Sequence, residues 1–131
     1  MPHADSDALV ERLARFERVV EVGVGRRPGV AAALADAGVD VTATDVVARE
    51  TPASVQFVRD DVTDPTRSVY ADADAVYALN APPELHRPCA EIARAVDAAF
   101  LFTTLGYDQP AISAERETLP NETLFVARRT R

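Results

Sequence analysis

A short stretch between two predicted secondary-structure elements constrains the fold of this chain most strongly. Residues 18–25 read Arg-Val-Val-Glu-Val-Gly-Val-Gly, a β-branched run that ends in two glycines. The run predicts a buried strand. Residues 28–37 carry apolar side chains at helical spacing and are followed by Gly38, so they predict a helix. The glycines therefore mark a tight turn from strand to helix, and Gly25 leaves room for a ligand to approach the backbone.

An acidic residue follows at a position suited to binding a nucleoside. Residues 39–46 predict a second strand, and Asp45 stands near its end, 20 residues after Gly25. At that distance in a strand–helix–strand unit, a carboxylate can accept hydrogen bonds from two ribose hydroxyls. The alternative is a plain glycine turn in a packed sheet, with Asp45 as a surface charge.

The rest of the chain alternates between strands and helices. Strands are predicted at residues 55–60, 75–79 and 99–105, and helices at 6–17, in part of 61–74 and within 83–98, where Pro88 leaves the start open. A hairpin is predicted at residues 116–128, with Leu119 and Leu124 on opposite arms. The pattern predicts an α/β fold: a Rossmann-like three-layer sandwich with a mostly parallel, doubly wound sheet of six or seven strands and a C-terminal antiparallel hairpin. We expect one domain over residues 1–131, with residues 1–5 disordered.

Composition bounds the class of protein. Apolar residues make up 47% of the 131 residues, which is typical of a globular chain of about one domain. No apolar run approaches the ~20 residues of a membrane span, and no signal peptide is recognisable. We therefore expect a cytoplasmic protein that does not contact the membrane. A lone Cys89 excludes a disulfide framework within the chain, and no metal site is expected.

The charge balance is acidic, with 21 acidic and 14 basic residues and a net charge of −7; every basic residue is Arg. A dense carboxylate surface suits very high salt, where self-repulsion is screened. The composition resembles that of haloarchaeal proteins. Because the solvent alone can account for the acidity, RNA stays open as a partner despite the negative charge.

The glycine turn also carries a resemblance to a known family. Glu21 lies two residues before Gly23, and Pro28 stands where a dinucleotide fingerprint has its third glycine. The pattern Glu-Val-Gly-Val-Gly resembles the first motif of class I S-adenosylmethionine (SAM) methyltransferases. The resemblance implies that Glu21 lies near the methionine ammonium of SAM, where a carboxylate attracts a cation and would repel a pyrophosphate.

The resemblance extends along the chain. It implies a cofactor site made of Glu21, Gly23, Gly25, Asp45, Val46, Asp61, Val62 and Asn80, with Asp61 and Val62 near the adenine. The stretch Asn80-Ala-Pro-Pro83 departs from the amino-methylating motif, because it has an extra Ala and no aromatic residue behind it. No catalytic role is therefore carried over. More narrowly, the chain is similar to a small archaeal family of Rossmann-like proteins without an assigned function.

A second resemblance supports an alternative. Residues 59–65 and 71–76 look like parts of the NAD-binding regulatory domains of potassium uptake systems. The sequence thus leaves open a SAM-binding methyltransferase-like protein of unknown substrate (small molecule or RNA), a non-catalytic NAD-binding or ligand-sensing module, and a degenerate Rossmann domain that acts through protein contacts. A homo-oligomer could supply missing substrate-binding surface. Weaker candidates for ligand contact are Arg26, Arg27, His86, Tyr107 and Asp108.

Overall fold

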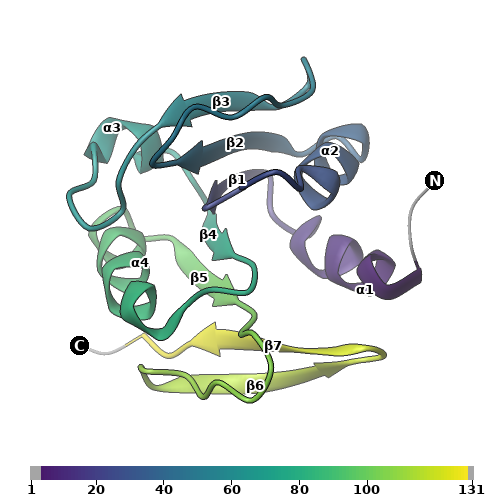
Figure 1. Cartoon of the computed structure of the whole chain (residues 1–131), viewed down its shortest axis with the longest axis vertical. Coiled ribbons are helices and arrows are strands. Elements are labelled where there is room, and N and C mark those ends of the chain that lie inside the picture. Colours follow the sequence, from purple (N-terminus) through teal and green to yellow (C-terminus); the bar gives the residue numbers. More distant parts are fainter. Residues whose placement is uncertain (1–3, 130–131) are drawn as a thin grey trace.

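A single seven-stranded sheet runs through the computed structural model, which describes residues 4–129 (Figure 1). The strand order is β3-β2-β1-β4-β5-β7-β6. The strands are β1 (Arg18–Val22), β2 (Asp40–Asp45), β3 (Gln56–Arg59), β4 (Ala75–Ala78), β5 (Ala99–Phe102), β6 (Ala114–Leu119) and β7 (Glu122–Ala127). Strands β1 to β5 pair in parallel, whereas β7 pairs antiparallel with both β5 and β6. The predicted α/β fold with a closing antiparallel hairpin is confirmed.

Helices cover both faces of this sheet. They are α1 (Ala4–Leu13), α2 (Gly29–Asp36), α3 (Arg67–Tyr70) and α4 (Pro83–Ala95). Helices α1 and α2 lie on one side of the sheet and α3 and α4 on the other (Figure 1). A three-layer arrangement follows from the strands themselves, because parallel strands are apolar on both faces and need cover on each.

Successive side chains of the central strands feed two separate cores. On β1, Val19 packs with the cluster under α1 and α2, whereas Val20 packs with the cluster under α3 and α4. The same alternation holds on β4, where Tyr77 joins the first cluster and Val76 the second. The strand period of two therefore decides which layer each residue serves.

Two helix boundaries differ from the sequence expectation. Helix α4 begins at Pro83 and continues through Pro88. Pro83 fits the first turn of a helix. Pro88 lacks the N–H that would bond the carbonyl of Glu84, a residue exposed to water, so the helix tolerates the loss. Helix α1 begins at Ala4 and includes Asp5, both of which were expected to lie in a disordered segment; the expectation for residues 1–3 lies outside the described residues. The single domain over residues 1–131 stays a prediction.

The hairpin is an integral part of the sheet. Leu119 and Leu124 lie on opposite arms, as predicted, and Leu119 pairs with Glu122 across the turn. Strand β7 carries Leu124, which is fully buried, and pairs with β5 through Leu101 and Phe102. The hairpin thus contributes buried side chains to both hydrophobic clusters, Leu124 to one and Phe125 to the other.

We predict that Leu124→Ala destabilises the fold by about 2–5 kcal/mol, because it removes a fully buried side chain and leaves a cavity. Chemical denaturation in molar KCl would measure the loss. Leu105→Ala is the matched control: Leu105 is 64% exposed, so its truncation should change the free energy of unfolding by less than about 0.5 kcal/mol. Equal effects of the two substitutions would mean that β7 is not part of the core.

Candidate functional site

The glycine turn leaves the sheet at the carboxyl end of β1. Gly23 and Gly25 both have positive φ, +76° and +58°, a conformation that side-chain-bearing residues rarely adopt. The N–H groups of Gly23 and Val24 donate to the carbonyl of Thr44, each at 3.0 Å. The N–H of Gly25 donates to Oδ2 of Asp45 at 2.8 Å. Three successive amides of the turn therefore face the end of β2.

Asp45 bonds to the glycine turn and also contacts two residues that follow it in the chain. Its carboxylate accepts the N–H of Gly25, lies 3.4 Å from Nε of Arg49 and accepts the N–H of Val47 at 3.3 Å. The residue is only 9% exposed. Asp45 is therefore not placed as a plain surface charge. Its role toward a ligand stays a prediction.

Glu21 is the unusual residue of β1. It is 2% exposed, and its Oε1 accepts a 2.7 Å hydrogen bond from the hydroxyl of Tyr77, its neighbour on β4. Burial raises the pKa of Glu21 to about 7, while the Tyr77 hydrogen bond acts in the opposite direction. No ion pair forms on Glu21 within the described residues. The carboxyl group therefore sits in the fold without a positive neighbour.

A broad cavity of about 1300 Å³ opens over this end of the sheet. It brings together Glu21, Gly23, Gly25 and Asn80, four of the predicted site residues. The remaining lining residues come from α1, from α2 and the turn before it, and from the ends of β4, β5 and the hairpin: Asp7, Leu9, Val10, Glu11, Val24, Arg26, Arg27, Gly29, Val30, Ala32, Ala33, Asp36, Leu79, Thr103 and Glu122. Five of the lining residues are acidic and two are basic, so the wall is negative.

Asn80 borders this cavity in a constrained conformation. Its φ is +50°, in the left-handed region that Asn tolerates better than most residues. Its N–H donates to Oγ1 of Thr103 at 2.8 Å, and the next amide, of Ala81, donates to the carbonyl of Thr103. The ends of β4 and β5 are thus tied together, which fixes the direction in which the chain leaves β4.

The other predicted site residues do not line the cavity. Val46 follows Asp45 and is 56% exposed. Asp61 is exposed and accepts hydrogen bonds from the N–H and hydroxyl of Thr63, which lower its pKa. Val62 is buried in the cluster under α3 and α4. Register places Asp45 beside Arg59 on β3, so residues 45, 46, 61 and 62 share the carboxyl edge of the sheet without joining the cavity.

The weaker candidates differ in their exposure to solvent. His86 is fully buried: Nε2 contacts the carbonyl of Ala81 at 3.0 Å, and Nδ1 accepts the N–H of Ala111 at 3.0 Å. It braces α4 against the segment before β6. Cys89 is buried as expected, and burial raises its pKa to about 12. Tyr107 is fully exposed and does not line the cavity.

Sequence reasoning missed Tyr77 and Thr103. Both carry a hydroxyl within or next to a buried strand, and each binds a group of the predicted site, Glu21 and Asn80 respectively. A polar hydroxyl in an otherwise apolar strand was the available signal. Only the register, in which Tyr77 lies beside Glu21, turns that signal into a contact.

Two features are absent from the described residues, 4–129. No helix there is long and apolar enough to cross a bilayer. No group of three or more His, Cys, Asp or Glu side chains is arranged there to hold a metal ion.

Comparison with known proteins decides the family. Residues 4–130 match the model of the uncharacterised protein family UPF0146. The chain belongs to this family. A UPF0146 protein of Halobacterium salinarum is 57% identical over 117 residues, covering 88% of this chain and 91% of the relative. One from Archaeoglobus fulgidus is 46% identical over 88 residues, covering 67% and 68%. The expected archaeal family is therefore confirmed.

Solved structures show the fold that UPF0146 shares. An RNA methyltransferase of Salinibacter ruber in complex with S-adenosylhomocysteine has a TM-score of 0.61 at 14% identity, covering 97% of this chain and 92% of that one. A TehB-like SAM-dependent methyltransferase of Corynebacterium glutamicum has a TM-score of 0.60 at 17% identity, covering 93% and 85%. A Rhodobacter sphaeroides structure assigned to the Zn-dependent alcohol dehydrogenases also reaches 0.60, at 16% identity, but over 82% and 49%. The fold is therefore Rossmann-like, with methyltransferases among its structural neighbours.

The raised pKa of Glu21 makes stability depend on pH. Between the unfolded pKa of 4.5 and the folded pKa of about 7, the folded chain retains a proton that the unfolded chain has lost. Stability contributed by this group therefore falls as pH rises through that window, by ~3 kcal/mol in all at 1.36 kcal/mol per pKa unit. We predict that Glu21→Gln removes this loss. Urea denaturation at about pH 5 and about pH 8 should show a variant that gains stability relative to wild type at the higher pH. An identical pH profile in both proteins would contradict it.

Proposed function

We propose that this protein binds S-adenosylmethionine in the cavity at the carboxyl edge of its sheet and is methyltransferase-like. The observation that carries the proposal is Glu21, a buried carboxyl group that lines the cavity and has no cationic partner in the described chain. A buried carboxylate is costly unless a positive group accompanies it. The ammonium of SAM would supply that group, and its sulfonium adds a second positive charge.

The charge of the cavity favours SAM over NAD. Five acidic side chains and two arginines line it. A pyrophosphate carries two negative charges, so its entry is opposed by the same wall that attracts a sulfonium. Screening at high salt weakens this preference at long range but acts less on Glu21, because buried charges are screened less than exposed ones.

The amides of the turn favour the same cofactor. In a dinucleotide site the turn and the helix behind it direct their N–H groups toward a pyrophosphate. Here the N–H groups of Gly23, Val24 and Gly25 bond to the end of β2. Pro28, at the start of α2, has no N–H to offer. The turn is therefore poorly equipped for a pyrophosphate, which counts against the NAD-binding alternative.

The remaining site residues enter the proposal by position. Asp45 would accept the ribose hydroxyls with the carboxylate lone pairs that the turn leaves open, and Asn80 would contact the cofactor from the end of β4. The adenine would lie near Asp61 and Val62, at the edge beyond β2 and β3. Val46, next to Asp45, would border the same part of the site. SAM bound there would supply a methyl group that can pass from its sulfonium to a nucleophile, with the electron pair of the S–CH₃ bond remaining on sulfur.

Isothermal titration calorimetry in molar KCl would test the proposal with SAM, S-adenosylhomocysteine, NAD and NADP in turn. We expect saturable binding of SAM and S-adenosylhomocysteine at one site per chain, and none of NAD or NADP, because the cavity is acidic and the turn amides are occupied. Binding of NAD alone would support the sensing module instead. If none of the four binds, the proposal is overturned, and the hypothesis of a degenerate Rossmann domain that acts through protein contacts is supported instead.

Asp45 provides a sharper test. Asp45→Ala removes the acceptor for the ribose hydroxyls, and hydrogen bonds to a charged group contribute ~1.5–3 kcal/mol each, so SAM affinity should fall by about tenfold or more. Asp45→Asn keeps an amide oxygen for the N–H of Gly25 but not the charge, and should lose affinity while retaining more stability than the Ala variant.

The matched control for both variants is Asp40→Ala. Asp40 lies at the opposite end of β2, where its side chain is 62% exposed and pairs with Arg18 at 3.2 Å. A surface pair of this kind contributes little, so SAM binding should match wild type. Wild-type affinity in both Asp45 variants would show that this carboxylate serves the turn only.

A further inference from the structure

A second cavity, of about 680 Å³, lies between helix α4 and the hairpin. It forms where the sheet lacks a covering helix. The connections from β1 to β2, from β3 to β4 and from β4 to β5 each contain a helix, whereas residues 103–113, between β5 and β6, contain none. The hairpin side of α4 is therefore left as a groove. Its size falls in the range of small-molecule sites.

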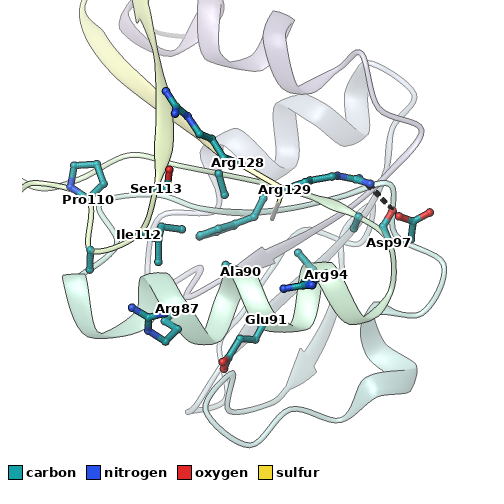
Figure 2. Close-up of a pocket in the computed structure, with 15 residues that line it drawn as sticks. Arg87, Ala90, Glu91, Arg94, Asp97, Pro110, Ile112, Ser113, Arg128 and Arg129 are labelled. Atoms are coloured by element: carbon teal, nitrogen blue, oxygen red, sulfur yellow. Dashed lines mark hydrogen bonds and ion pairs between the residues drawn. The ribbon is translucent and has the colours of Figure 1, made fainter. Parts of the chain in front are cut away.

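The floor of this groove is apolar. Phe100 on β5 is 2% exposed, and Ala93 on α4 is 1% exposed. Ala90, Ile112 and Ala127 line the groove beside them and are half-buried. Figure 2 shows Ala90 on helix α4 and Ile112 on the segment that faces it, before the hairpin. A flat apolar body of a ligand would find contact on this floor.

The rim is formed by arginines from two elements. Arg87 and Arg94 come from α4, and Arg128 and Arg129 follow β7 (Figure 2). Four of the 15 lining residues are Arg, against 14 of 131 in the whole chain. Only two lining residues are acidic. An acidic protein therefore presents a locally positive groove, opposite in sign to the cavity at the carboxyl edge.

Most of this positive charge is not neutralised by the protein. Arg129 pairs with Asp97 at 2.9 Å, as the dashed line in Figure 2 marks. The guanidinium groups of Arg87, Arg94 and Arg128 form no hydrogen bond or ion pair with any described residue. Guanidinium groups without partners on opposite banks of an apolar groove are suited to a carboxylate or phosphate, which arginine binds with two parallel hydrogen bonds.

We propose that this groove is a second ligand site, which takes a small organic anion with a flat apolar body and one carboxylate or phosphate group. The apolar body would lie on Phe100, Ala90 and Ile112, and the anionic group would bind Arg94. The exposed side chain of Arg128, which points away from α4 in Figure 2, would turn toward the groove to bind the same anion. The site stands apart from the SAM cavity and does not depend on SAM binding.

The probe is 1-anilinonaphthalene-8-sulfonate, a flat apolar anion, titrated by fluorescence in molar KCl. We expect one saturable site per chain. Arg94→Ala and Arg128→Ala should each weaken binding by about tenfold, because each removes charge-assisted hydrogen bonds to the anion. Ala90→Trp should block the groove without removing a charge. N-phenyl-1-naphthylamine, the same ring system without the sulfonate, should bind more weakly and be insensitive to the arginine substitutions.

Arg15→Ala is the control, because Arg15 is an exposed arginine that lines neither cavity. It should bind the probe as wild type does, and thermal melts should show all variants folded. Displacement by naphthoate or by naphthyl phosphate would then rank the two anionic groups. Equal binding of the charged and neutral probes, or wild-type affinity in Arg94→Ala and Arg128→Ala, would overturn the proposal. Displacement of the dye by S-adenosylhomocysteine would also overturn it, by placing the dye at the carboxyl edge.

Discussion

The structure depends on strand β1, which lies inside the sheet between β2 and β4. Val19, Val20 and Val22 are buried, and they feed the cores on both faces. Such a strand tolerates a carboxyl group only if the group is neutral or has a positive neighbour. Burial raises the pKa of Glu21 to about 7 and so favours the neutral form, while the hydrogen bond from Tyr77 acts in the opposite direction. No positive neighbour of Glu21 is present among the described residues. The cationic ligand proposed above would account for a residue that otherwise weakens the fold as pH rises toward neutral.

The end of β2 bonds to the glycine turn, and the proposed binding of a ribose would use some of the same atoms. The carbonyl of Thr44 and the carboxylate of Asp45 together accept three successive amides of the glycine turn. A carboxylate offers about four lone-pair positions. Gly25, Val47 and Arg49 already contact the carboxylate of Asp45, so the proposed ribose would use the remaining positions or displace a weak contact. Two of these three contacts are long: the one to Arg49 at 3.4 Å and the one to Val47 at 3.3 Å. A ligand would replace these two most easily.

The sequence was most informative where a pattern repeats over several residues. β-Branched runs, helical spacing and the turn around Pro120 predicted every strand, the main helices and the hairpin. It was least informative where a contact joins distant segments. Tyr77 meets Glu21 only through strand register, and His86 is buried only because the segment before β6 folds over α4. The groove with four arginines was invisible for the same reason, since Arg87 and Arg128 are far apart in the chain and neither follows a motif.

High salt changes how the two oppositely charged cavities would act. At molar ionic strength the Debye length is about 3 Å, so the net charge of −7 exerts little force beyond direct contact. Long-range steering of an anion toward the arginines, or of a cation toward the acids, is then weak, and selectivity must come from groups that touch the ligand. Glu21 is buried and retains its influence. Arg94 and Arg128 are exposed, so their contribution would rest on bidentate hydrogen bonds made beside an apolar floor that excludes water and ions. Affinity of an anion for that groove should accordingly depend on the shape of its apolar body as much as on its charge.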